Sequence, residues 1–432
     1  MKIHILGICG TFMGGLAQIL LEKGHQVSGA DQQFYPPMSD QLHRLGVEMI
    51  QGYDPTSLPT ADLFIIGNAL SRGNPSVEYI LSHKLPFTSG PQMLGELIEG
   101  RQVIAVAGTH GKTSTSFMLC EIFQHQSVDI GYLVGGVSQS IESSAQLGSA
   151  GIFVIEADEY DSAFFDKRSK FVHYHPDTLI VNNIEFDHAD IFSNLLDILK
   201  QFHHVIRTIP ADGNILIYPE GDNMSALMDM GYWSHVHKIG TKETIAIDMK
   251  KNIFSFGDKI FNLNALPFNG MHNYQNAIMA MYAAFLHGVA PRDSFKALEG
   301  FTGVKRRFET IYHDQDFIVI DDFAHHPTAI ASTTATAKGL FDQKILGIIE
   351  LGSNTMSGGF HGTELYKSAE SLDKTLWLNL SSTSNNPHEF NSLEMLLEEL
   401  KHYLDQFGVI LIMSNKDSKK ISDPLIELIK AK

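Results

Sequence analysis

Short apolar runs alternate with polar turns and with segments of helical periodicity over most of the chain. In the first hundred residues, the patterns at 2–8, Gln26–Gly29 and Leu63–Gly67 predict strands, and Leu16–Lys23 and Pro91–Glu99 predict helices. Strands that alternate with helices are typical of βαβ units built on a parallel sheet. The pattern therefore predicts a first α/β domain.

Two further units of the same kind follow. The second opens with the apolar strand at Val103 and continues with strands at Ile152–Ile155 and Leu179–Val181. The third follows Arg306–Arg307, and its predicted strands are Phe317–Ile320, Ile345–Ile349, Thr375–Leu378 and Val409–Met413. The chain is thus expected to be an α/β protein with three units in series.

The pattern changes between the second and third units. From Gly213 to about Leu263, short β-rich pieces (I-L-I-Y, T-I-A-I, I-F-S-F, K-I-F-N-L) are separated by Gly, Asp and Asn, which predicts a small antiparallel appendage. Tyr274–Leu286 then has helical periodicity, with one apolar face made of Ala277, Ile278, Met281 and Phe285. We place the domains at residues 1–100, 101–302 and 303–432.

Size and composition narrow the class of protein. The chain has 432 residues, of which 44% are hydrophobic and 19% charged, as in a soluble globular protein of several domains. Its net charge of −17 argues against nucleic acid or an anionic membrane surface as the main partner. With two cysteines and no apolar segment long enough to span a bilayer, a reducing cytoplasm without membrane insertion is expected. Nothing in the sequence fixes the oligomeric state, and a monomer is our default.

The N-terminal segment M-K-I-H-I-L-G-I-C-G-T-F-M-G-G-L-A resembles a signal peptide only superficially. It has one lysine, several glycines within the apolar run and no small-x-small cleavage site. The segment instead fits a strand, a glycine turn and a helix, with the irregular spacing G-x-x-G-x-x-x-G-G and a second strand that ends at Asp31. This turn is either a ligand-binding dinucleotide-type turn or a tight strand-to-helix turn without a ligand.

The run V-I-A-V-A-G-T-H-G-K-T-S, from Val103 to Ser114, carries the clearest chemistry. An apolar strand leads into a glycine turn, and a Lys-Thr-Ser triplet begins a predicted helix. Backbone N–H groups in such a turn and the helix N-terminus form an anion site, where Lys112 can reach terminal phosphates and Thr113 can ligate magnesium. The general G-x-x-x-x-G-K-[ST] pattern needs glycine at Val106, so the loop is the tighter G-x-x-G-K-T. Its position between strand and helix favours an ATP site over a chance turn.

Two other strands of the second unit end in acidic and polar sequence. One gives I-E-A-D-E-Y-D with Glu156, and the other gives N-N-I-E-F-D-H-A-D with His188. Ligands bind beyond the carboxyl ends of parallel strands, where a carboxylate and an imidazole can hold magnesium against triphosphate oxygens. Each segment could also be a solvated acidic loop. Their joint placement beside Lys112 favours a metal site made by Thr113, Glu156 and His188.

Three further motifs lie at predicted element ends. H-N-Y-Q-N places His272 and Asn276 on one helix face, while Asn273 could be an ordinary N-terminal cap. The arginines of R-R-F-E could be solvated or could close over a phosphate. D-D-F-A-H-H-P follows a strand, and its polar side chains could contact ribose, metal or an incoming nucleophile; these are Asp322, His325 and His326.

In their order along the chain, these motifs resemble those of the Mur ligases, the ATP-dependent amide-forming enzymes of peptidoglycan synthesis. The resemblance rests on G-T-H-G-K-T, E-A-D-E, N-x-x-x-D-H, H-N-x-x-N, R-R-F-E and D-D-F-A-H-H-P, and it covers essentially the whole chain. Longer matches, among them E-Y-D-S-A-F-F-D-K-R-S-K-F and F-D-H-A-D-I-F, resemble one branch. That branch joins a recycled murein tripeptide, L-alanyl-γ-D-glutamyl-meso-diaminopimelate, to UDP-N-acetylmuramate.

The resemblance implies a Rossmann-like UDP-binding domain, a central P-loop ATPase domain with the β appendage, and a C-terminal Rossmann-like domain. It implies that ATP, with Mg²⁺, phosphorylates the sugar's lactyl carboxylate, and that the tripeptide amine then attacks the acyl phosphate. Lys112, Glu156 and His188 would be the catalytic residues. The implied ATP site consists of Gly108, Thr109, His110, Gly111, Lys112, Thr113, Ser114, His272, Asn273, Asn276, Arg307 and Asp322. The implied UDP-sugar site consists of Gly7, Gly10, Thr11, Gly14, Gly15 and Asp31. His325, His326, Ser353 and Asn354 are the candidates for peptide contacts.

Two departures from the family concern the third domain and the metal. The branch usually has E-P-R-S-N-T-M, but here Gly352 stands where arginine is expected, and K-D-S-K-K-I replaces a glycine-rich segment after M-S-N. Several relatives bridge magnesium with a carbamylated lysine, which we cannot assign within K-Q-F-H-H. Two alternatives therefore stay open: a ligase that adds L-alanine alone, and a catalytically silent protein that binds the nucleotide sugar.

Overall fold

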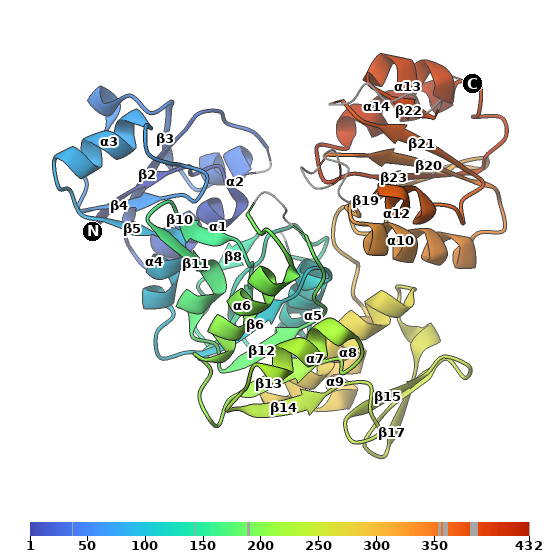
Figure 1. The fold of residues 1–432 in the computed structure, drawn as a ribbon, viewed down its shortest axis with the longest axis horizontal. Helices are drawn as coiled ribbons and strands as arrows, with labels where there is room; N and C mark the ends of the chain where they lie inside the picture. The colour runs from blue at the N-terminus through green and yellow to red at the C-terminus, as the bar shows by residue number, and fades with distance from the viewer. Residues whose placement is uncertain are drawn as a thin grey trace. The chain divides into compact units, whose positions relative to one another are not determined.

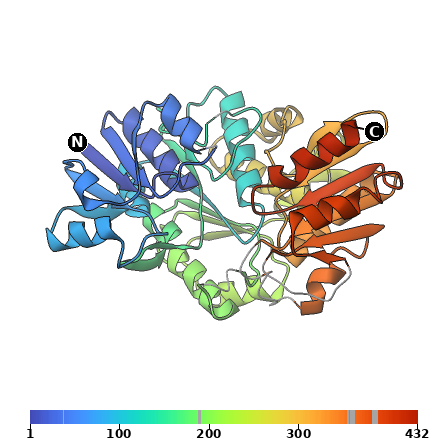
Figure 2. The same ribbon diagram turned by 90° about the horizontal axis from the view of Figure 1, so that it is seen from above.

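The computed structural model describes residues 1–36, 38–141, 143–187, 191–352, 356, 362–380 and 388–431 (Figures 1 and 2). These residues form two compact units. Unit 1 comprises Met1–Glu185, Leu195–Pro267 and Gln275–Thr302. Unit 2 comprises Phe186–Asn194, Phe268–Tyr274 and Gly303–Lys432.

Unit 1 begins with a five-stranded parallel sheet in the order β3-β2-β1-β4-β5, drawn in blue in Figure 1. This order reverses between β1 and β4, which is the place where doubly wound sheets bind ligands. The predicted strands and helices of this region are present. The elements are β1 (Lys2–Leu6), α1 (Thr11–Glu22), β2 (Gln26–Asp31), α2 (Met38–Arg44), β3 (Glu48–Gln51), η1 (Pro55–Ser57), β4 (Leu63–Ile66), α3 (Pro75–Ser82), β5 (Phe87–Ser89) and α4 (Gly90–Leu97).

The second sheet of unit 1 has seven strands in the order β14-β13-β12-β6-β9-β7-β8. All its neighbours are parallel except β7 and β8, and β6 is buried along almost its whole length. Its elements are β6 (Gln102–Ala107), α5 (Lys112–His125), β7 (Gly131–Leu133), β8 (Ala145–Gln146), β9 (Ile152–Glu156), β10 (Asp161–Ala163), β11 (Asp166–Ser169), η2 (Lys170–Tyr174), β12 (Thr178–Val181), α6 (Leu195–Ile206), β13 (Asn214–Ile217), α7 (Asp222–Asp229) and β14 (His235–Lys238).

The antiparallel appendage is present but begins later than predicted. Its three strands, in the order β15-β16-β17, are β15 (Ile245–Asp248), β16 (Ile253–Phe256) and β17 (Lys259–Asn262), followed by η3 (Leu263–Ala265), α8 (Met271–Leu286) and α9 (Pro291–Glu299). The prediction that the I-L-I-Y segment belongs to the appendage is wrong, because this segment forms β13 of the second sheet. β13 pairs in parallel with β12, and Ile215, Leu216 and Ile217 are fully or almost fully buried in the second sheet.

Helices α1 and α4, which belong to the first sheet, contact segments that flank the second sheet. The Ser143 hydroxyl donates to Gln18 Oε1 at 2.7 Å, and the backbone N–H of Leu147 donates to Glu22 Oε2 at 2.6 Å. A Cβ at Gly95 in α4 would lie 2.3 Å from the His173 carbonyl oxygen of η2, so these two elements approach closely. Unit 1 therefore fixes α1 and α4 against the second sheet.

Unit 2 is built on a six-stranded sheet in the order β18-β19-β23-β20-β21-β22, in which only β18 is antiparallel to its neighbour. Separate apolar clusters, one containing Ile348 and Leu396 and the other Ile349 and Ile330, form its core. The elements are β18 (Glu309–His313), β19 (Ile318–Asp322), α10 (Pro327–Leu340), β20 (Ile345–Glu350), α12 (Gly362–Lys367), β21 (Lys374–Leu378), β22 (Glu389–Phe390), α13 (Leu393–Leu400), β23 (Val409–Met413) and α14 (Lys419–Lys430). In the part of the chain that the structure describes, no helix combines the length and apolar character needed to cross a membrane.

A buried histidine in β1 makes unit 1 sensitive to acid. His4 is inaccessible to solvent, its Nδ1 lies 2.8 Å from the Ser28 hydroxyl, and burial lowers its pKa from 6.5 to about 4. The His4 imidazole of the unfolded chain takes up a proton at a higher pH than that of the folded chain. The free energy of unfolding is therefore unaffected by His4 above pH 6.5 and falls as the pH drops towards 4. Acidification from pH 7 to pH 5 should therefore lower the free energy of unfolding by about 2 kcal/mol because of His4.

Hydrogen exchange of the β1 amides at the two pH values, corrected for intrinsic exchange, measures this cost. In His4→Leu, the decrease in the free energy of unfolding between pH 7 and pH 5 should be about 2 kcal/mol smaller than in the wild type. The exposed His125→Leu should leave the dependence unchanged. An equal pH dependence in His4→Leu and the wild type would contradict the assignment.

Candidate functional site

Three adjacent strands bring the predicted motifs to one edge of the second sheet. β6 lies between β12 and β9, and all three run in parallel. Their carboxyl ends lead into Gly108–Gly111, Ala157–Glu159 and Asn182–Glu185. The sequence placed these segments at strand ends, and the strand order makes them neighbours.

The turn after β6 depends on two glycines. Gly108 and Gly111 have φ of +129° and +81°, in the region that favours glycine. A Cβ at Gly108 would lie 3.0 Å from the Asn183 carbonyl oxygen, and a Cβ at Gly111 would lie 2.4 Å from Asn276 Oδ1. Gly111 is the N-cap of α5 and offers no capping side chain. The first N–H groups of α5 are therefore suited to an anion.

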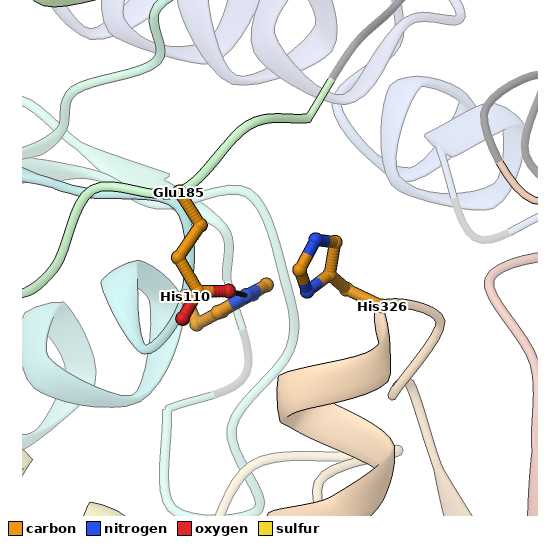
Figure 3. Close-up of side chains that lie close together, drawn as sticks. All are labelled: His110, Glu185 and His326. Atoms are coloured by element: carbon orange, nitrogen blue, oxygen red, sulfur yellow. Dashed lines mark hydrogen bonds and ion pairs between the residues drawn. The ribbon is translucent and has the colours of Figure 1, made fainter. Parts of the chain in front are cut away.

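The segment after β12 holds this turn in shape. The Asn183 side chain accepts from the His110 N–H at 2.8 Å and donates to the His110 carbonyl oxygen at 3.2 Å, while the Thr109 N–H donates to the Asn183 carbonyl at 3.1 Å. His110 Nε2 also lies 3.1 Å from Glu185 Oε2. Figure 3 draws these two side chains next to each other. The loop is thus fixed by hydrogen bonds before any ligand is considered.

Lys112, the first residue of α5, has a buried ammonium group. Its Nζ donates to the Gly108 carbonyl at 2.6 Å and to Glu159 Oε2 at 3.0 Å. Burial acts to lower the pKa of Lys112, but the carboxylates of Glu159, Asp158 and Glu156 outweigh it and raise the pKa. The lysine is therefore charged at neutral pH and is positioned at the loop.

Thr113 and Glu156 form a pair of hard oxygen donors. The Thr113 hydroxyl donates to Glu156 Oε1 at 2.8 Å, and the Gly135 N–H donates to Glu156 Oε2 at 2.6 Å. A hydroxyl and a carboxylate that already touch can converge on one small divalent cation, which prefers such ligands. His188, the third predicted metal ligand, lies outside the described residues.

The side chains of H-N-Y-Q-N lie at the start of α8. Asn276 is buried in unit 1 and contacts, at Gly111, the turn after β6 (Gly108–Gly111), which we call the phosphate loop. In unit 2, His272 Nδ1 lies 2.7 Å from the Ser332 hydroxyl. Asn273 is inside the helix rather than at its cap, and its Nδ2 donates to the Asn269 carbonyl at 2.8 Å. Of the three residues, the structure brings Asn276 to the loop.

Arg307 lies just before β18, and Asp322 is the last residue of β19. The Arg307 guanidinium carbon lies 4.8 Å from the centroid of the Phe323 ring. Asp322 is buried and accepts from the N–H groups of Phe308 and Ala324 at 2.7 and 2.8 Å. This carboxylate therefore closes a local turn.

The two histidines of D-D-F-A-H-H-P contact backbone groups of unit 2. His325 Nδ1 lies 2.9 Å from the Phe323 carbonyl oxygen. His326, which Figure 3 also draws, belongs to unit 2, and as the N-cap of α10 it accepts from the Thr328 N–H at 3.4 Å. Its Nε2 lies 3.3 Å from the Phe186 carbonyl oxygen. Ser353 and Asn354 lie outside the described residues.

Close packing explains why the chain has glycine at position 352. A Cβ there would lie 2.4 Å from Asn415 Oδ1 and 2.7 Å from Lys416 Cγ. The side chain of Lys416 thus occupies the space beside Gly352, where the family resemblance leads us to expect arginine. The two departures from the family motif, at Gly352 and after Met413, are in direct contact.

In the glycine-rich segment after β1, Gly7 and Gly10 have the features of an anion site, whereas Gly14 and Gly15 do not. Gly7 has φ of +81°, and Gly10 is the N-cap of α1, which begins at Thr11 without a capping side chain. Asp31 Oδ2 accepts from the Cys9 N–H at 2.8 Å and so closes the turn. In the helix, a Cβ at Gly14 would lie 2.7 Å from Met38 Sδ, and one at Gly15 would lie 3.1 Å from Ala145 Cβ. Gly14 and Gly15 therefore permit close packing.

Sequence reasoning gave no role to several residues that shape this site. Glu159 pairs with Lys112, and Asn182 and Asn183 bind the phosphate loop. The signal available was their position, since each follows a strand of the same sheet as the loop. The missing information was the order of those strands.

Alanine at Gly111 should disrupt the phosphate loop. A residue with a Cβ at φ of +81° is strained, and this Cβ would collide with Asn276. We expect Gly111→Ala to weaken ATP binding by at least about tenfold, measured by calorimetry, because the loop must move. Gly100→Ala is the matched control, since Gly100 has φ of +80° with no atom within 4 Å. Equal ATP affinities for the two variants would contradict the argument.

Three family descriptions match the chain in succession. "Mur ligase family, catalytic domain" matches residues 2–102, "Mur ligase middle domain" matches 106–284, and "Mur ligase, glutamate ligase domain" matches 306–417. These matches follow the order of the two sheets of unit 1 and the sheet of unit 2.

Individual relatives agree with these matches. The UDP-N-acetylmuramate–L-alanyl-γ-D-glutamyl-meso-2,6-diaminoheptandioate ligase of Escherichia coli K12 is 47% identical over 88% of this chain and 85% of its own. The protein of the same name from Haemophilus influenzae is 41% identical over 100% of this chain and 99% of its own. The crystal structure of a murein peptide ligase from Psychrobacter arcticus 273-4 is 40% identical, with a TM-score of 0.77, and the alignment covers 99% of this chain and 98% of that one.

Proposed function

Because the chain belongs to the Mur ligase family and is an ATP-dependent ligase, we propose that it joins L-alanyl-γ-D-glutamyl-meso-diaminopimelate to UDP-N-acetylmuramate. The observation that carries the proposal is full-length similarity to ligases named for these two substrates, together with an intact phosphate loop. The reaction belongs to peptidoglycan recycling in the cytoplasm. The proposed domains are residues 1–100 for the UDP-sugar, 101–302 for ATP and 303–432 for the peptide.

The proposed reaction has two steps. An oxygen of the lactyl carboxylate attacks the γ-phosphorus of ATP, so that an acyl phosphate forms and ADP leaves. The alanyl amine of the tripeptide then attacks the acyl carbon, loses a proton and expels phosphate as the amide bond forms. The first step brings two anions together, and this repulsion is the main barrier that the site must lower.

The residues around the phosphate loop fit this demand. The N–H groups at the start of α5 and the charged Lys112 would bind the γ-phosphate and stabilise the negative charge that moves onto ADP. Thr113 and Glu156 would hold Mg²⁺, and His188 would hold a second metal ion. When bound, Mg²⁺ supplies further neutralisation of the triphosphate oxygens. Asn276 would contact the nucleotide from α8, because its side chain adjoins Gly111.

Other site assignments are part of the same proposal. The N–H groups at the start of α1, after Gly7 and Gly10, would bind the diphosphate of the sugar nucleotide. Arg307, His272 and Asn273 are further candidates for contacts with ATP. For the peptide we propose contacts from unit 2, with His325 and His326 as candidates.

An amine panel tests the proposal. Purified protein is mixed with ATP, Mg²⁺ and UDP-N-acetylmuramate, and phosphate release is measured with the tripeptide, with free L-alanine and without amine. We expect release that depends on the tripeptide and is not stimulated by L-alanine. Equal turnover with both amines would favour the L-alanine ligase alternative, and no turnover with any amine would favour a silent binder.

A further inference from the structure

A second buried lysine lies near the phosphate loop and has no role in the reaction described so far. Lys170, the first residue of η2, has an exposed fraction of 8%. Its Nζ lies 3.1 Å from Asp158 Oδ2 and 5.7 and 5.5 Å from the ring centroids of Phe12 and Tyr160. An ammonium in this setting has lost most of its water, so its charge acts strongly on any anion nearby.

The partners of Lys170 connect it to both proposed nucleotide sites. Phe12 is the second residue of α1, directly beside the helix N-terminus that follows the glycine turn. Asp158 is next to Glu159, the partner of Lys112, and Asp158 itself contributes to the raised pKa of Lys112. Lys170 therefore lies between the start of α1 and the lysine of the phosphate loop.

The position of the Phe12 ring is fixed by the start of α4. A Cβ at Gly90 would lie 2.9 Å from Phe12 Cε1 and 2.8 Å from Met13 Sδ, so glycine is needed there to admit both side chains. The aromatic wall beside Lys170 is thus part of the packing between α1 and α4.

A structural ion pair does not account for all of this ammonium's hydrogen-bonding capacity. An ammonium group has three N–H donors. Within the described ranges, Asp158 is the one hydrogen-bond acceptor found for Lys170 Nζ, and the two rings offer only their π faces. Burying an ion pair is costly unless the remaining donors are also satisfied.

We propose that Lys170 binds the lactyl carboxylate of the sugar nucleotide, an inference that rests on the proposed function. In the proposed complex, the diphosphate of the sugar nucleotide lies at the start of α1, and the γ-phosphate of ATP lies at Lys112. The sugar acid is attached to the diphosphate and receives the γ-phosphate, so its carboxylate must lie between these two groups. Lys170 is the buried cation in that place. The N–H donors for which the described residues offer no acceptor hold the carboxylate for attack, while Asp158 keeps the side chain oriented.

Binding of two sugar nucleotides separates this role from a structural one. UDP-N-acetylmuramate carries the lactyl carboxylate, and UDP-N-acetylglucosamine lacks it. The affinities of both are measured by calorimetry for the wild type, Lys170→Met and Lys170→Arg. Lys167→Met is the matched control, because Lys167 is an exposed lysine of β11, shortly before Lys170, and pairs with Asp161.

The wild type should bind the acid in preference to the neutral sugar. Lys170→Met should lose at least tenfold in affinity for UDP-N-acetylmuramate and keep its affinity for UDP-N-acetylglucosamine within about twofold. Lys170→Arg should retain part of the preference, and Lys167→Met all of it. If Lys170→Met does not fold, the double variant Asp158→Asn/Lys170→Met removes the unpaired charge and is measured in the same way.

Equal losses for both nucleotides in Lys170→Met, or no loss for either, would overturn the inference and leave the lysine a structural role. In either case the wild type still prefers the acid, so the proposed function stands. A wild type that binds neither nucleotide would instead overturn the proposed function, and this inference with it.

Discussion

Lys112→Ala should lower ATP-dependent phosphate release by at least about a thousandfold, because the ammonium that neutralises the γ-phosphate is lost. In the structure this ammonium lies among the carboxylates of Glu159, Asp158 and Glu156, and its removal leaves three anions beside the place where a triphosphate must bind. Affinity for UDP-N-acetylmuramate, measured by calorimetry, should stay within about threefold of the wild type, since that site is at the start of α1.

Lys200→Ala is a suitable control for this experiment. Lys200 is a half-exposed lysine of α6 that pairs only locally with Asp197. It should turn over at the wild-type rate. Retention of even a tenth of the activity in Lys112→Ala would show that the phosphate loop has another role.

Glu156→Gln should change how the enzyme depends on magnesium. The carboxylate accepts from the Thr113 hydroxyl and the Gly135 N–H, and an amide of the same shape loses the charge that a divalent cation requires. We expect turnover at millimolar Mg²⁺ to fall by about a hundredfold or more, and the Mg²⁺ concentration for half-maximal rate to rise at least tenfold.

A titration of phosphate release against Mg²⁺ measures both quantities. Glu121→Gln, on the same helix as Thr113, is the control, because Glu121 binds the Ser140 hydroxyl at a distance from the loop. A Glu156→Gln variant with reduced turnover but the wild-type Mg²⁺ requirement would place this carboxylate outside the metal site.

The sequence predicted the parallel sheets well because buried strands leave a direct pattern. Val103–Ala107 is apolar throughout, and the structure buries every one of its residues in the middle of a sheet. The β13 segment has the same apolar pattern, yet it was placed in the appendage. A short apolar strand does not reveal whether its neighbours are parallel or antiparallel, and that depends on contacts distant in sequence. Short, half-polar elements such as α2 and β3 were not predicted for a related reason, since their burial is partial.

In the candidate site, too, contacts within one sheet could be predicted, and contacts between segments distant in sequence could not. The pairing of Thr113 with Glu156 could be expected, because the residues follow strands of one parallel sheet. The position of Lys170 could not, because the Phe12 ring that it faces belongs to α1, far away in the sequence, and no local pattern joins them. The sequence also could not tell that Asp322 and His326 use their polar atoms in a turn and a helix cap. Their roles towards ligands remain predictions.

The hydrogen bonds between Asn183 and the loop after β6 have a consequence for nucleotide affinity. A flexible loop loses conformational entropy when it closes on a phosphate, and that loss reduces the binding free energy. Here the backbone on both sides of His110 is already ordered by one asparagine side chain. The entropic cost is met when the protein folds, so the contacts with the triphosphate contribute to affinity with little loss to loop ordering.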